Sequence, residues 1–199
     1  MLFVAAALGF PALTVYGADM LRLYRRRKRR QLELNSRVSL GAVAALIATI
    51  AIASIVAVAA PTDAGVAALT YMAIFGWLTG LGLAQLYKIV PFLTWLECYA
   101  PILGRVPTPR VQDLVDERKA MRWFILFFAA VAVATLALLA QQPTVFRLAA
   151  FCQLIATLCL ILEFARARRL AHVSIIVQLP GGAVRPNLFL PHMPTRRSP

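Results

Sequence analysis

The chain has 199 residues, of which 61% are hydrophobic and 15% are charged, with a formal net charge of +13. A soluble globular domain is typically about 45–50% apolar and about 25% charged, so this composition excludes an ordinary soluble domain and indicates a membrane protein. The basic residues flank apolar segments, which favours contacts with a lipid bilayer and its anionic headgroups over contacts with nucleic acid.

Five apolar segments are long enough to cross a membrane as helices, and they predict an all-α fold, a polytopic helix bundle. In chain order they cover residues 1–16, 40–60, 66–95, 123–140 and 148–164. Pro91 is expected to kink or end the third span, because proline has no N–H to donate. Residues 113–122 predict a short interfacial helix before the fourth span.

Positive charge marks one side of this bundle. Of the 21 Lys and Arg residues, 20 lie on alternate connections, and the two connections between them carry only Arg147. Lys and Arg are retained in the cytoplasm, so we expect the N-terminus outside and the C-terminus in the cytoplasm, in the cell (inner) membrane. The predicted contacts with lipid headgroups are Arg25, Arg26, Arg27, Lys28, Arg29 and Arg30.

Two domains are expected from the change in composition along the chain. Residues 1–169 form the transmembrane bundle. Residues 170–199 are rich in proline and are expected to be a poorly ordered cytoplasmic tail.

The third segment contains two patterns that go beyond simple membrane crossing. Small residues at four-residue spacing, Gly76, Gly80 and Ala84, predict a helix face to which another backbone packs closely.

The same segment ends in polar residues, which are Gln85, Tyr87, Lys88 and Glu97. Polar groups at membrane depth suggest a path for a solute, and anchoring of the helix at the interface is the alternative explanation. Asp19 beside Arg22 and Glu163 beside Arg166 are expected to be ion pairs at the same interface.

The ionisable residues indicate no catalytic or cofactor chemistry. The two histidines, His172 and His192, both lie after the last apolar segment. Haem and metal sites in helical bundles usually take His ligands from the helices, so no intrinsic cofactor or metal site is predicted. Ser-His-Asp machinery and phosphate-binding loops are also missing, which favours a protein that is not an enzyme. A lipid-modifying enzyme using Glu97 or Asp113 stays a weaker alternative.

One stretch of the third segment and its connection resembles a known family. Its distinctive residues are Gly76-Trp77-Leu78, residues 85–95 (QLYKIVPFLTW), Tyr99-Ala100-Pro101 and Gly104-Arg105. This pattern resembles the C-terminal half of bacterial membrane proteins related to haem-copper oxidase subunit I. Oxidases of that family hold haem and copper on intramembrane histidines, which this sequence lacks. The resemblance therefore implies a relative without those ligands, or a piece of a protein about twice as long.

Two functions follow as hypotheses. The first is an oxidase subunit I-like integral membrane protein without a redox centre of its own, associated with other membrane subunits of respiration. The alternative is a small permease or transporter component, with a polar route near Gln85, Tyr87 and Lys88.

Overall fold

A computed structural model describes Pro11, residues 15–19, Arg22, Arg25, residues 33–58 and residues 62–174. The described residues from 33 onward form helices without a β-strand. The elements are α2 (Leu34–Val58), α3 (Asp63–Tyr71), the π-helix η1 (Met72–Thr79), α4 (Gly80–Tyr99), the 3-10 helices η2 (Ala100–Ile102) and η3 (Val111–Leu114), α5 (Glu117–Leu139) and α6 (Pro143–Arg168).

Four helices of the described chain are long and apolar enough to cross a membrane, namely Leu34–Val58, Asp63–Ile102, Glu117–Leu139 and Pro143–Arg168. They correspond to the second to fifth predicted spans, and they confirm the all-α class. The predicted first span, residues 1–16, lies mostly outside the described residues, as do Arg26 to Arg30 and the tail beyond Ser174.

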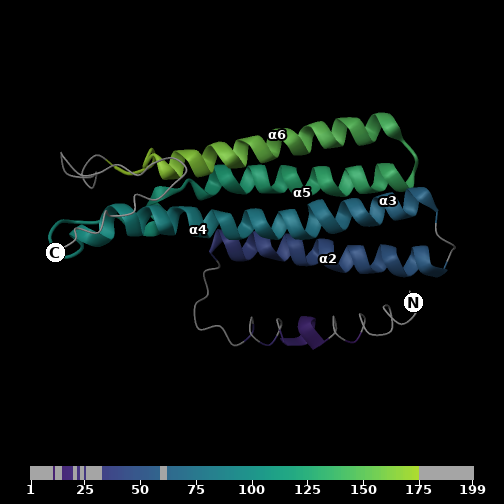
Figure 1. The fold of residues 1–199 in the computed structure, drawn as a ribbon, viewed down its shortest axis with the longest axis horizontal. Coiled ribbons are helices and arrows are strands. Elements are labelled where there is room, and N and C mark those ends of the chain that lie inside the picture. The colour runs from purple at the N-terminus through teal and green to yellow at the C-terminus, as the bar shows by residue number, and fades with distance from the viewer. Residues whose placement is uncertain are drawn as a thin grey trace, which may run out of the picture.

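The four helices run antiparallel to their neighbours in the chain (Figure 1). The long helix formed by α3, η1 and α4 packs against α2 on one side and against α5 and α6 on the other, and α5 packs along α6. At one end, caps mark the beginnings of α3 and α6. Thr62 caps α3 by accepting a hydrogen bond from the Gly65 N–H at 3.1 Å, and Pro143 occupies the first turn of α6.

The sequence predicts that Pro91 kinks or ends the third span, and the structure shows that the helix does not end there. Pro91 lies inside α4, and the helical segment extends over 40 residues to Ile102. At 1.5 Å per residue this is about 60 Å, roughly twice the thickness of a hydrocarbon core. The helical segment is therefore longer than a single membrane crossing requires, and the C-terminal part of α4 packs against η2 and η3.

The interfacial helix predicted for residues 113–122 is not a separate element. Val111–Leu114 form the turn η3, and α5 begins at Glu117, six residues before the predicted start of the span. The Asp116 carboxylate caps α5 by accepting from the N–H groups of Arg118 and Lys119, both at 3.1 Å. Hydropathy identifies only the apolar part of such a helix, whereas the cap fixes its true beginning.

The hydrogen bonds to Asp116 also set its protonation. The backbone N–H of Lys119, the Lys119 ammonium and the Arg118 N–H together hold the pKa of this carboxyl below its usual range. Because the folded-state pKa is lowered, the cap contributes stability at neutral pH, and that contribution is lost as the pH falls through the folded-state pKa.

Many small residues are buried between the helices beside a few large ones such as Phe124 and Phe127, while large apolar side chains cover much of the outer surface. Ala42, Ala84 and Ala156 are completely buried, whereas Phe151 and Leu136 are more than 60% exposed. Apolar side chains gain nothing by leaving lipid, so helices in a membrane associate through close packing of small residues. This arrangement fits a hydrocarbon surrounding and would leave a very large apolar surface in water.

The stripe of small residues lies on the packed face of the long helix. A methyl group added at Gly76 would come within 2.9 Å of the Ala45 Cβ of α2, and one added at Gly80 within 2.8 Å of the Phe128 ring of α5. Ala84 is fully buried one turn further along. At these positions the long helix approaches both neighbours as closely as the backbone allows.

We expect Gly76→Ala to lower the free energy of unfolding by about 1–3 kcal/mol, because Ala45 has no rotamer with which to retreat and α2 must shift. Gly82 is the matched control, since nothing lies within 4 Å of a methyl group added there. Gly82→Ala should be neutral or stabilising by up to about 1 kcal/mol. Unfolding of the detergent-solubilised protein measures both; equal stabilities would contradict close packing at Gly76.

Candidate functional site

The charged residues of the described helices gather at one end of the bundle. The N-terminal ends of α2 and α5 meet the C-terminal ends of α4 and α6 there (Figure 1). At the opposite end, the part of the chain from residue 33 to 174 carries Asp63 and Arg147 as its charged side chains. The charged end is therefore the place where the described structure concentrates polar chemistry.

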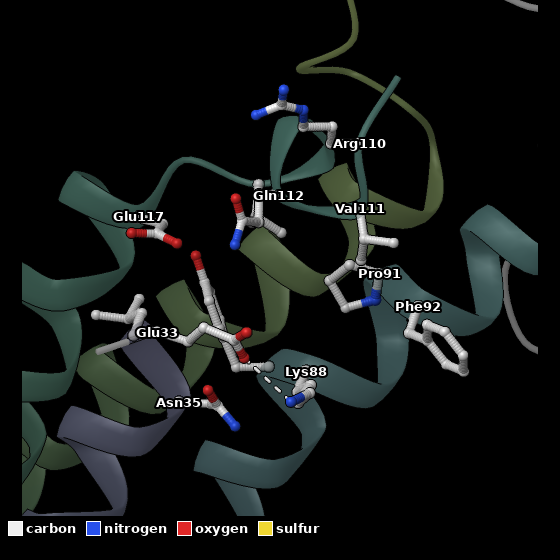
Figure 2. A pocket seen from close by; sticks show the side chains of 12 residues that line it. Glu33, Asn35, Lys88, Pro91, Phe92, Arg110, Val111, Gln112 and Glu117 are labelled. Atoms are coloured by element: carbon white, nitrogen blue, oxygen red, sulfur yellow. Dashed lines mark hydrogen bonds and ion pairs between the residues drawn. The ribbon is translucent and has the colours of Figure 1, made fainter. Parts of the chain in front are cut away.

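A cavity of about 380 Å³ lies at this charged end, between α2, α4 and the connection that leads into α5. Its lining residues are Glu33, Leu34, Asn35, Tyr87, Lys88, Pro91, Phe92, Arg110, Val111, Gln112, Val115 and Glu117. Figure 2 shows Gln112 and Glu117 directed toward the same space as Glu33 and Asn35, with Lys88 on one side of this group and Arg110 on the other.

Two buried polar atoms of the cavity lack a hydrogen-bond partner in the protein. They are the Tyr87 hydroxyl and the Asn35 Oδ1, and the Tyr87 side chain is only 5% exposed. Buried polar groups are almost always hydrogen-bonded, and an unsatisfied one costs about 1–3 kcal/mol. Pro91 also has no N–H for the Tyr87 carbonyl four residues earlier. Unused hydrogen-bonding capacity therefore lies on two lining side chains, one from α2 and one from α4.

Lys88 and Glu33 form the ion pair of the cavity, with Nζ 3.0 Å from Oε2. Both side chains are about half exposed, at 58% and 44%. Such an exposed pair contributes at most about 1 kcal/mol and separates readily in favour of another partner. The two charges are therefore available to a ligand at little energetic cost.

A second ionic cluster joins α4 to α6 away from the cavity. The Arg168 guanidinium lies 2.6 Å from Glu97 Oε2 and donates to Thr94 Oγ1 at 3.3 Å. The side chains of Arg168 and Glu97 are only 11% and 16% exposed. This pair is a structural connection between two helices, because it is short and largely enclosed.

Glu163 is the centre of a neighbouring group on α6. Its carboxylate is buried and accepts from Arg166 at 2.5 Å, while His172 Nε2 lies 3.4 Å away. The predicted Glu163–Arg166 pair is confirmed, as is the exposed Asp19–Arg22 pair at 3.5 Å. The histidine contact connects the end of α6 to the residues that follow it.

The structure separates the four residues of the predicted polar path. Tyr87 and Lys88 line the cavity, Gln85 is exposed and does not line it, and Glu97 is paired with Arg168. Of the predicted headgroup contacts, Arg25 is described and exposed. Glu33, Asn35, Gln112 and Glu117 were not predicted, because they come from segments distant in sequence and carry no local signal.

A polar contact within the apolar half of the bundle was also missed. The Tyr71 hydroxyl of α3 donates to Gln153 Oε1 of α6, and Gln153 is 7% exposed. Phe146 packs edge-on against the Tyr71 ring, with 5.5 Å between centroids. This contact holds the helices at the end opposite the cavity.

Comparisons with protein-family models, curated proteins and solved structures found no match for this chain. Among the described residues, no group of three or more His, Cys, Asp and Glu side chains is placed to hold a metal ion.

Replacing Glu97 by glutamine should lower the free energy of unfolding by about 2–3 kcal/mol, because it leaves the enclosed Arg168 guanidinium without its counter-charge. The same change at Glu33 removes an exposed ion pair and should cost less than about 1 kcal/mol. Chemical unfolding in detergent micelles compares the two variants. A Glu97→Gln protein as stable as Glu33→Gln would show that the α4–α6 pair does not hold these helices together.

Proposed function

We propose that the chain is a multi-pass protein of the cell (inner) membrane with about five spans, its N-terminus outside and its charged end in the cytoplasm. Four apolar helices support the membrane assignment. The concentration of Lys and Arg on alternate connections, with Arg147 as the exception, supports the orientation, because positively charged connections are retained in the cytoplasm.

A cytoplasmic-only reporter fused after Pro199 should be active, and the same reporter inserted at Thr62, in the turn between α2 and α3, should be silent. A reporter that functions only in the periplasm should give the opposite pattern: silent after Pro199 and active at Thr62. Periplasmic activity at Pro199 would reverse the proposed orientation.

Within that membrane we propose a non-catalytic subunit, similar to oxidase subunit I but without a redox centre, that associates with respiratory components. The observation that carries this proposal is the position of residues 85–95, the part of the sequence that resembles oxidase subunit I. Tyr87, Lys88 and Pro91 line the cavity, and the Trp95 indole N–H donates to the Pro109 carbonyl at 2.7 Å. These residues organise the charged end around a binding cavity.

The absence of histidine from the predicted apolar segments supports binding over redox chemistry, because His172 and His192 both follow the last of them. The helical segment that includes α4 is longer than a single crossing requires, and its additional length offers a surface for other subunits, which fits a role in an assembly.

The protein purified after expression on its own should show no haem absorption band, whereas protein isolated gently from its native membrane should migrate with haem-containing complexes on a native gel. The first measurement tests the lack of a redox centre and the second tests the association. A Soret band in the isolated chain, or migration free of any respiratory component, would contradict the corresponding part of the proposal.

A small permease is the second candidate, and the unpartnered Tyr87 hydroxyl beside Lys88 favours it. One turn deeper, Leu83 and Ala84 belong to the buried core, so a solute would have to part these helices to continue. For a permease, Lys88→Ala should abolish solute flux with membrane insertion intact, and Lys119→Ala, which is outside the cavity, should not. Unchanged flux in Lys88→Ala excludes this candidate.

A further inference from the structure

The cavity lies at the depth of lipid headgroups. α2 begins at Leu34 and α5 at Glu117, and both starting residues line it. These helices have 25 and 23 residues, which corresponds to about 35–37 Å and slightly exceeds a hydrocarbon core of about 30 Å. Their ends, and the cavity between them, therefore reach the headgroup layer.

The cavity is also adjacent to a lipid-facing surface. Phe92 belongs to the lining, and its side chain is 47% exposed. On the same helix, Ile89 and Leu93 are about half exposed. A lipid whose head enters the cavity can thus leave its acyl chains along the outer face of α4.

The charges of the lining are balanced. Two carboxylates, Glu33 and Glu117, and two cations, Lys88 and Arg110, surround the cavity. An anionic headgroup would neutralise the two cations, but it would leave the two carboxylates without a positively charged partner. A zwitterionic head presents both charges together and so complements both pairs.

The unpartnered atoms specify the cationic half of the ligand. Asn35 Oδ1 can only accept a hydrogen bond, so its partner must be a donor. A primary ammonium has three N–H donors, enough for Asn35, the Tyr87 hydroxyl and a carboxylate. A quaternary trimethylammonium has none, and would leave Asn35 Oδ1 unsatisfied.

We propose that this cavity binds a membrane lipid with a phosphate–primary-ammonium head, of the phosphatidylethanolamine type. The ammonium lies among Asn35, Tyr87 and the carboxylates, and the phosphate at Lys88, the cation that is paired with Glu33 in the absence of a ligand. A volume of about 380 Å³ is at the lower end of the range for small-molecule sites and holds a head without its acyl chains.

The test compares three lipids of identical acyl chains on the full-length protein by native mass spectrometry. The lipids are phosphatidylethanolamine, phosphatidylcholine and phosphatidylglycerol. The wild-type protein should retain phosphatidylethanolamine at least about 5-fold more tightly than the other two, since one ordinary hydrogen bond contributes about this factor. Equal retention of the three, or preference for phosphatidylglycerol, overturns the proposal.

Tyr87→Phe removes the hydroxyl and keeps the ring, and it should weaken phosphatidylethanolamine binding about 5-fold. Tyr71→Phe makes the same change at the opposite end and should leave binding unchanged. Glu117 is exposed, so Glu117→Gln preserves the fold. Because it removes a carboxylate that faces the ammonium, it should reduce the preference over phosphatidylglycerol. Wild-type binding in both cavity variants overturns the proposal.

Discussion

Hydrocarbon solvates neither a charge nor an unpaired backbone group, and this constraint determines the arrangement of the chain. It requires helices that satisfy their own backbone, and it confines ionisable side chains to the helix ends. Within the described residues from 33 to 174, charge is therefore concentrated at one end, with Asp63 and Arg147 at the other. The cavity, the ion pairs and the helix caps all lie toward the helix ends, where charged and polar groups are tolerated.

Close packing holds the apolar part together in place of a hydrophobic driving force. Gly76 and Gly80 bring the long helix against α2 and α5, and the π-helix η1 lies at the same level. A π-helix widens the turn and rotates the residues after it, which sets the face that α4 presents at the charged end. The position of Tyr87 and Lys88 thus depends on packing deep in the membrane.

Sequence patterns predicted the second to fifth spans well, because hydropathy is a local property. They predicted the ends less well: α5 begins at the Asp116 cap, and α4 continues through Pro91, which is buried inside the helix. The partners of charged residues were not predictable by local rules. Lys88 pairs with Glu33, 55 residues earlier, whereas Glu163 and Arg166 are three apart on one helix and were predicted.

The two ionic groups of α4 differ in a way that assigns their roles. Glu97 and Arg168 are enclosed, and removing either would leave a buried charge, so this contact is suited to fixing α4 against α6. Lys88 and Glu33 are half exposed, and they border a hydroxyl and an amide oxygen that the protein does not satisfy. A helix held at Glu97 can keep Tyr87 in place about three turns away on α4, whereas Asn35 is carried by α2. The rigid pair therefore preorganises the α4 side of the cavity, and the exposed pair is left free to exchange partners.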